Sequence, residues 1–172
     1  VRGWIGFEER ADGSVSPVPE LTFSVAMQYL DAKYVSFPNF DSAGTDLSGQ
    51  RVDGVPQLST TLGATYVQPV GEIGNFVARV DYHYESETPL GATSLATFVR
   101  PQLSAYSRQV DAMNASVGLE MENGLTFTLW GRNLTNAQYL TTLFPTTARG
   151  GDSISGYPSQ PRTYGGTLRF KF

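Results

Sequence analysis

The sequence predicts an all-β fold: an antiparallel, up-and-down transmembrane β-barrel, of which this chain supplies about seven consecutive strands. Three observations lead to this prediction. Apolar and polar residues alternate along several extended segments, which gives each segment one apolar and one polar face. The connections between segments are short and long in turn, as periplasmic turns and extracellular loops are in outer-membrane barrels. The apolar faces carry no charged residue in their central parts.

The last predicted strand, Tyr164–Phe172, shows the alternation most clearly. Its apolar face carries Tyr164, Gly166, Leu168, Phe170 and Phe172, and its polar face carries Gly165, Thr167, Arg169 and Lys171. The chain ends on an aromatic residue, although a large apolar side chain gains little at the fraying end of a soluble domain. The final strand of an outer-membrane barrel has a use for it, because it places an aromatic ring at the lipid–water interface.

Six further strands are predicted upstream. In chain order they are about Val1–Arg10, Glu20–Phe37, Gln57–Gln68, Asn75–Glu87, Tyr106–Met121 and Leu125–Asn133. The shorter connections between them are rich in turn-forming residues: 11–20, 69–75 and the Asn-Gly turn at Asn123–Gly124. The longer connections are 38–56, 88–105 and about Leu134–Pro161. With the C-terminus at the periplasmic side, these three become extracellular loops.

A soluble β-sandwich also alternates apolar and polar residues, so the alternation alone leaves that fold open. Two features favour the barrel. The predicted strands have about 10 to 16 residues, which suits a tilted crossing of a bilayer. Aromatic residues gather near strand ends, with Phe76 at one end of its strand and Tyr82 and Tyr84 toward the other. Seven strands would leave two open edges, so we expect a fragment of a larger barrel.

The composition excludes several classes of function. The net charge is −4, and no cluster of Lys and Arg is present to bind nucleic acid. The chain has no cysteine, which excludes disulfides, thiolate metal sites and a thiol nucleophile. No apolar run approaches the roughly 18 residues that a membrane-spanning helix needs. The single histidine has no nucleophile motif beside it, so we expect no enzymatic activity, no cofactor and no bound metal.

Two segments near the end of the chain point to a family. LWGRNLTNAQYL at 129–140 ends a strand with an Asn-Leu-Thr-Asn motif and a following Tyr, and PRTYGGTLRFKF at 161–172 opens the last strand with Pro-Arg-Thr-Tyr and ends it in Phe. In this order and spacing they resemble the C-terminal end of TonB-dependent outer-membrane receptors. GFEE at 6–9, LDAKY at 30–34 and LSGQRVDGVPQLSTTLGATY at 47–66 are similar to preceding strands of that family. The resemblance covers almost the whole chain.

The resemblance implies a receptor barrel of roughly 22 strands with a plugged lumen. Residues 1–172 would be its C-terminal portion, with the plug domain and the N-terminal strands absent. The family imports scarce nutrients across the bacterial outer membrane, with a ferric siderophore as the default substrate. The TonB energy-transducing complex drives import through the plug. A passive porin-like channel is the alternative within the membrane.

The resemblance also implies partners for the barrel itself. These are outer-membrane lipid, the receptor's own plug domain and the barrel-assembly machinery. The terminal strand is similar to the sorting signal that this machinery reads, and the residues that would form the signal are Tyr164, Leu168, Phe170 and Phe172.

Two groups of candidate site residues follow from the predicted orientation of the strands. Polar residues expected to face the lumen are Arg79, Asp81, His83, Glu85, Arg132, Arg169 and Lys171. His83 is a candidate for contact with the plug, a substrate or a metal, but a hydrated lumen residue held by its neighbours is the simpler interpretation. Candidates for substrate contact are aromatic and arginine residues of the long loops, with simple loop packing as the alternative for each: Phe40, Phe98, Arg100, Tyr139, Phe144, Arg149 and Tyr157.

Overall fold

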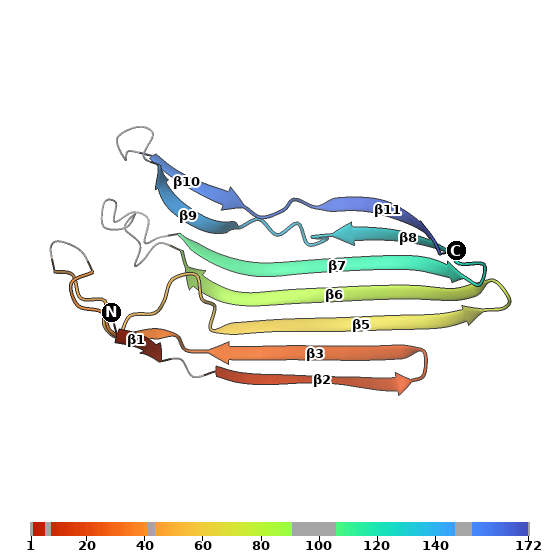
Figure 1. Ribbon diagram of the computed structural model, residues 1–172, viewed down its shortest axis with the longest axis horizontal. Helices are drawn as coiled ribbons and strands as arrows, with labels where there is room; N and C mark the ends of the chain where they lie inside the picture. Colours follow the sequence, from red (N-terminus) through yellow and green to blue (C-terminus); the bar gives the residue numbers. More distant parts are fainter. Residues whose placement is uncertain (1, 6–7, 41–43, 91–105, 147–152, 172) are drawn as a thin grey trace.

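Figure 1 shows the computed structural model of the chain, which describes residues 2–5, 8–40, 44–90, 106–146 and 153–171. Regular structure in these residues consists of β-strands, and no helix among them is long and apolar enough to cross a membrane. The strands are β1 (Arg2–Ile5), β2 (Glu8–Val18), β3 (Leu21–Leu30), β4 (Lys33–Ser36), β5 (Leu58–Val70), β6 (Gly74–Pro89), β7 (Ser107–Met121), β8 (Leu125–Arg132), β9 (Leu140–Thr146), β10 (Ser153–Pro158) and β11 (Thr163–Phe170).

Seven of these strands form one antiparallel sheet in the order β2–β3–β5–β6–β7–β8–β11, and two-stranded ribbons pair β1 with β4 and β9 with β10. The connections at one end of the sheet, the turn end, are residues 19–20, 71–73 and 122–124. The strand ends that the long connections join lie at the opposite end, the loop end, together with β9 and β10 (Figure 1). The prediction of seven up-and-down strands with alternating short and long connections is confirmed, as is the Asn-Gly turn between β7 and β8.

The predicted end of the first strand at Arg10 is wrong. β2 continues through the turn-forming residues to Val18, and the turn is confined to residues 19–20. The small residues of this stretch keep the strand alternation, because Asp12 and its neighbours stay in register with β3. β2 is an edge strand with a register irregularity before Val18, where the missing N–H of Pro17 is tolerated.

Two other predicted boundaries also differ from the structure. The second predicted strand is interrupted, since β3 ends at Leu30 and β4 resumes at Lys33 to pair with β1. The long connection about Leu134–Pro161 contains β9 and β10, which pair with each other beyond the edge of the sheet. The sequence predicted this connection as a loop, but pairing between its two halves satisfies the backbone groups that a loop would leave to water.

The two faces of the seven-stranded sheet differ in chemistry. Cross-strand partners share a face, so Val25 of β3 lies between Gly13 of β2 and Leu62 of β5. This apolar face carries exposed large side chains, which include Val15, Phe23, Val25, Met27, Tyr29, Leu62, Tyr66, Phe76, Val80, Val117, Phe127, Leu129, Tyr164, Leu168 and Phe170. The residues between them along each strand form the polar face.

Little hydrophobic surface is buried between the elements. Among the described residues the buried hydrophobic side chains are Ala32, Leu47, Leu90 and Val110, all toward the loop end. The described strands form one large sheet and two small ribbons and not two packed sheets, so the β-sandwich alternative is wrong. An uncovered apolar face of this extent marks a surface that contacts lipid or another apolar partner.

Candidate functional site

Four of the polar residues that were predicted to face the lumen lie on the polar face of β6. They are Arg79, Asp81, His83 and Glu85. Their cross-strand partners on β5 and β7 are mostly small or polar: Thr65 and Ser116 for Arg79, Gly63 and Asn114 for Asp81, Thr61 and Ala112 for His83, and Ser59 and Val110 for Glu85. The row therefore runs along the polar face from the middle of β6 toward the loop end.

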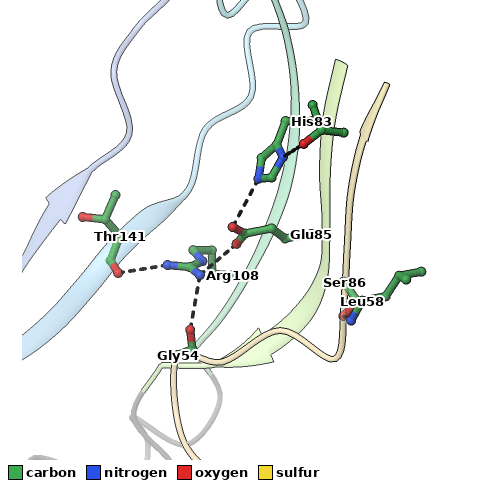
Figure 2. A network of polar contacts seen from close by, with 8 residues as sticks. Gly54, Leu58, His83, Glu85, Ser86, Arg108 and Thr141 are labelled. Atoms are coloured by element: carbon green, nitrogen blue, oxygen red, sulfur yellow. Dashed lines mark hydrogen bonds and ion pairs between the residues drawn. The ribbon is translucent and has the colours of Figure 1, made fainter. Parts of the chain in front are cut away.

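Glu85, at the loop end of this row, forms a half-buried ion pair with Arg108 of β7. Arg108 Nη2 donates to Glu85 Oε2 at 2.8 Å, and the two side chains are only 16% and 20% exposed. A β-bulge helps to bring them together, because the register of β6 and β7 shifts just beyond Glu85. The same guanidinium also reaches two backbone carbonyls, with Nη2 3.3 Å from Gly54 O and Nη1 3.4 Å from Thr141 O (Figure 2).

The connection from β3 to β5, residues 31–57, is called the first loop below. It is held against the loop end of β6 by bonds separate from those of Arg108. Gly54 N donates to Pro89 O at 2.9 Å, and Thr88 Oγ1 donates to Val55 O at 3.0 Å. Thr88 is 2% exposed, so this second bond is shielded from water. The first loop is therefore docked on the sheet.

His83 continues the polar network toward the middle of the sheet. Its Nε2 lies 3.3 Å from Glu85 Oε1, and its Nδ1 lies 3.0 Å from Thr61 Oγ1 of β5 (Figure 2). This geometry fits the simpler interpretation, a histidine held by its neighbours. Among the described residues there is no group of three or more His, Cys, Asp or Glu side chains that could hold a metal ion.

Phe40 belongs to a row of aromatic rings in the first loop. Its ring meets that of Phe37 edge-on with the centroids 5.7 Å apart, and Phe37 lies 5.1 Å from Tyr34. The three rings are half-buried. The Ser48 hydroxyl accepts from Phe37 N at 2.9 Å, and hydrogen bonds from the Ser48 side chain and backbone lower the pKa of Asp46 below its ordinary value. The loop thus combines aromatic surface with a readily ionised carboxylate.

Tyr139 lines a cavity of about 350 Å³ at the stem of the β9–β10 ribbon, together with Arg132 and Asn114 of the polar face. The guanidinium of Arg132 stands 5.1 Å from the centre of the Trp130 ring, a cation–π contact. Neither Phe40 nor Tyr157 lines this cavity. Tyr157 is 62% exposed on β10, and Phe144 belongs to β9. The other loop candidates lie outside the described residues: Phe98, Arg100 and Arg149.

The Asn-Leu-Thr-Asn segment, residues 133–136, ties the end of β8 to the neighbouring strand β7. Asn133 N donates to the side chain of Asn114 at 3.0 Å, Leu134 N donates to Met113 O at 2.7 Å, and Thr135 Oγ1 donates to Asp111 O at 2.7 Å. Asn133 is buried, and its side chain makes further bonds to the chain that enters β11. The motif therefore has a structural role in ending one strand and placing the next.

The final strand β11 lies at the edge of the sheet and carries its apolar residues on the apolar face, beside those of β8. Tyr164 lies opposite Gly131 of β8 and covers it, since a Cβ at position 131 would come within 3.1 Å of the Tyr164 ring. The exposed fractions of Tyr164, Leu168 and Phe170 are 66%, 69% and 59%. Arg169 is on the opposite, polar face at the turn end, where Thr126 is its partner. Phe172 lies outside the described residues.

Residues 6–134 match a family model described as "TonB dependent receptor-like, beta-barrel". This chain belongs to the TonB-dependent receptor family. The family comprises receptors and transporters and not enzymes. The match spans all of the sheet except β11, including the whole polar row on β6 and its partners on β7. No curated protein matches this receptor chain.

Three solved structures that are similar to the receptor chain are receptors as well. The ferric yersiniabactin uptake receptor FyuA from Yersinia pestis superposes with a TM-score of 0.74 at 13% identity, over 98% of this chain and 24% of that one. The siderophore receptor PiuA from Acinetobacter baumannii superposes with a TM-score of 0.66 at 16% identity, over 98% of this chain and 22% of PiuA. BauA, the ferric preacinetobactin receptor of the same species, superposes with a TM-score of 0.53 at 19% identity, over 94% of this chain and 22% of BauA. At these identities the likeness shows the fold, and the chain spans less than a quarter of each receptor.

Arg108 is the residue of this receptor site that sequence reasoning missed. A signal existed, because counting back two residues at a time from Asn114 along β7 reaches Arg108 on the polar face. Its loop partners gave no such signal. Gly54 and Thr141 are 54 and 33 positions away in the sequence, and both contribute backbone carbonyls that any residue could supply.

Proposed function

We propose that the chain forms the C-terminal strands of an outer-membrane receptor barrel that imports a scarce nutrient, with a ferric siderophore as the substrate class. The family match carries this proposal. The substrate class is supported by the described functions of the similar structures, which are receptors for ferric yersiniabactin, for ferric preacinetobactin and for a siderophore.

In the proposed arrangement the apolar face of the sheet contacts lipid and the polar face lines the lumen. Lipid supplies the cover that the apolar face lacks among the described elements. The polar face then keeps charged side chains out of the hydrocarbon, where each Arg or Lys would cost about 2 to 4 kcal/mol at the midplane. The proposed lumen residues are Arg79, Asp81, His83, Glu85, Arg132, Arg169 and Lys171. The loop end is extracellular and the turn end periplasmic.

Substrate contact is assigned to residues of the long connections. Aromatic rings offer flat apolar contact and arginine offers a cation, which suits the aromatic groups and chelating oxygens of a siderophore. The structure describes the side chains of three of the proposed contact residues. Phe40 lies in the aromatic row of the first loop, Tyr139 lines a cavity together with Arg132, and Tyr157 lies on β10. The remaining candidates are assigned by their place in the sequence: Phe98, Arg100, Phe144 and Arg149.

The rest of the receptor supplies what this chain does not contain. The open edges of the sheet at β2 and β11 pair with further barrel strands, because lipid cannot satisfy their backbone groups. Import requires the receptor's own plug domain and the TonB energy-transducing complex. In the outer membrane, the barrel-assembly machinery reads the terminal residues Tyr164, Leu168, Phe170 and Phe172.

Growth under iron limitation tests the proposal. A strain that lacks the complete gene is supplied with one ferric siderophore at a time as its iron source. We expect growth on at least one of them to be lost, and to return when the gene is supplied on a plasmid but not in a strain without TonB. Wild-type growth of the deletion strain on every siderophore would contradict the substrate class. Rescue that persists without TonB would favour a passive channel.

A further inference from the structure

We propose that Arg108 is a positioning residue of the receptor entrance, which holds the first loop and the β9–β10 ribbon in one fixed arrangement. The part of this inference that concerns ligand affinity rests on the proposed function. The part that concerns the two loops rests on the geometry of Arg108 alone.

The first step is the anchor. Arg108 is the second residue of β7, and Glu85 lies on β6, so the two belong to neighbouring strands at the centre of the seven-stranded sheet. Their 2.8 Å bond joins two side chains that are mostly shielded from water. A shielded, charge-assisted pair is stronger than an exposed one, because water screens it less. Glu85 therefore fixes the guanidinium in place relative to the sheet.

The second step is what the fixed guanidinium reaches. Gly54 O belongs to the first loop and Thr141 O belongs to β9, and the two approach Arg108 from different directions (Figure 2). At 3.3 and 3.4 Å these contacts are long for hydrogen bonds. Attraction between the positive guanidinium and the two carbonyl dipoles therefore contributes to them alongside the hydrogen bonds. One side chain thus links the sheet to two long connections that lie far apart in the sequence.

The third step is why an arginine is needed. A guanidinium presents several N–H groups in a rigid planar fork, and Arg108 uses Nη1 for Thr141 and Nη2 for Glu85 and Gly54. The ammonium of a lysine is a single point and would remain with the carboxylate of Glu85. Arg108→Lys would therefore preserve the ion pair and lose the spread of contacts to the two loops.

The consequence differs for the two connections. The first loop has its own bonds to β6 through Gly54 N and Val55 O, so it stays docked when Arg108 is replaced. The β9–β10 ribbon extends beyond the sheet, and loss of the contact at Thr141 releases it relative to the first loop. A ligand that touches both connections then has to order them at the moment of binding, which lowers its affinity.

Distance measurement between two spin labels tests the inference in the complete receptor. Gln50 of the first loop and Thr142 of β9 are exposed positions, and the chain has no cysteine of its own, so Gln50→Cys with Thr142→Cys places one label on each connection. Double electron–electron resonance should give a narrow distance distribution in the parent protein. We expect Arg108→Ala to broaden it, and Arg108→Lys to broaden it as well, because both variants lose the contacts to the two loops.

Arg10→Ala is the matched control. Arg10 lies on the same cross-strand row of the polar face as Glu85, joined to it in register through Gln28 and Ser59. Its described ion pair is an exposed one with Asp12, so Arg10→Ala removes a charge of the same sign and leaves the contacts of Arg108 with Gly54 and Thr141 in place. The distance distribution of Arg10→Ala should match that of the parent.

A distribution in Arg108→Ala as narrow as that of the parent would overturn the inference. If Arg108→Ala fails to assemble, Glu85→Gln replaces it as the test variant, because glutamine keeps the shape of the glutamate side chain and removes its charge. We expect Glu85→Gln to broaden the distance distribution too, and a distribution as narrow as that of the parent would overturn the inference.

The same variants test ligand affinity. If the fraction of molecules in the binding-competent arrangement falls to about a tenth, the affinity for a transported ferric siderophore falls about tenfold. Absence of any siderophore binding by the parent would count against the proposed function, and the label distances would still decide the role of Arg108.

Discussion

The side chain of Asn133 joins the end of β8 to the segment that leads into β11, because its Nδ2 donates to Gln160 O at 2.8 Å. The same carboxamide bonds Ala137 twice, with Nδ2 2.9 Å from Ala137 O and Oδ1 accepting from Ala137 N at 2.8 Å. Asn133 is buried and has φ of 51°, a left-handed backbone that asparagine tolerates better than most residues. One residue thus ends a strand, turns the chain and closes the stem of the β9–β10 ribbon.

Asn133→Asp should destabilise the barrel. The substitution keeps the shape and the acceptor Oδ1, but it replaces the Nδ2 donor with an oxygen that faces the carbonyls of Ala137 and Gln160. We expect a loss of about 2 to 3 kcal/mol, the cost of unsatisfied buried polar groups. Urea titration of the purified receptor, followed by the gel shift between folded and unfolded barrel, measures it. Asn136→Asp is the control, since Asn136 has a similar φ of 58° but is exposed. Equal losses in the two variants would contradict the role of the buried side chain.

The sequence predicts the strands well where the alternation is local. β5, β6, β7 and β8 begin and end close to the expected residues, because each carries its two faces in its own residues. β2 was predicted too short because its turn-forming residues lie on an edge strand, where pairing with β3 outweighs local preference. The β9–β10 ribbon was missed because its pairing joins two halves of one polar connection.

The candidate site also has features that the sequence could predict and features that it could not. The polar row on β6 could be predicted because alternation assigns a side chain to a face. The contact of Arg108 with Thr141 could not, because it depends on how a connection folds back onto the sheet. The aromatic row of Phe40 is intermediate, since the residue types were visible and their contacts with Phe37 and Tyr34 were not.

Gly165→Ala should disturb the pairing of β11 with β8. The ring of Trp130 lies across Gly165, so an added Cβ would overlap it. Trp130 is also held by a bond from its Nε1 to Thr167 Oγ1 at 3.1 Å, which limits how far the ring can move. We expect a loss of about 1 to 3 kcal/mol in the free energy of unfolding, together with a shift of tryptophan emission.

The neighbouring Gly166→Ala is the control for that substitution. A Cβ at Gly166 would meet its nearest neighbour, Leu129 Cδ2, at 3.5 Å, an ordinary contact. The variant should retain the stability and the emission of the parent. Gly165→Ala as stable as Gly166→Ala would show that the ring of Trp130 is not fixed over Gly165.

Phe172→Ala should lower the amount of receptor in the outer membrane. The proposed sorting signal needs its terminal aromatic residue, and β11 already presents Tyr164, Leu168 and Phe170 on the same face. Quantitative blotting of membrane fractions measures the effect, with Lys171→Ala on the polar face as the control. Equal amounts of Phe172→Ala and parent receptor would remove the terminal residue from the proposed signal.

A single arginine placed on either face of β3 distinguishes the lipid side of the sheet from the lumen side. Val25 is 43% exposed at the middle of the apolar face, between Gly13 and Leu62, whereas the next residue, Ala26, lies on the polar face beside Asp12. Val25→Arg should cost about 2 to 4 kcal/mol if position 25 is near the bilayer midplane, since the charge would face hydrocarbon. Ala26→Arg should cost less, because its charge faces water and the carboxylate of Asp12. Unfolding of both variants in lipid vesicles measures the difference, and a larger loss for Ala26→Arg would reverse the assignment of the two faces.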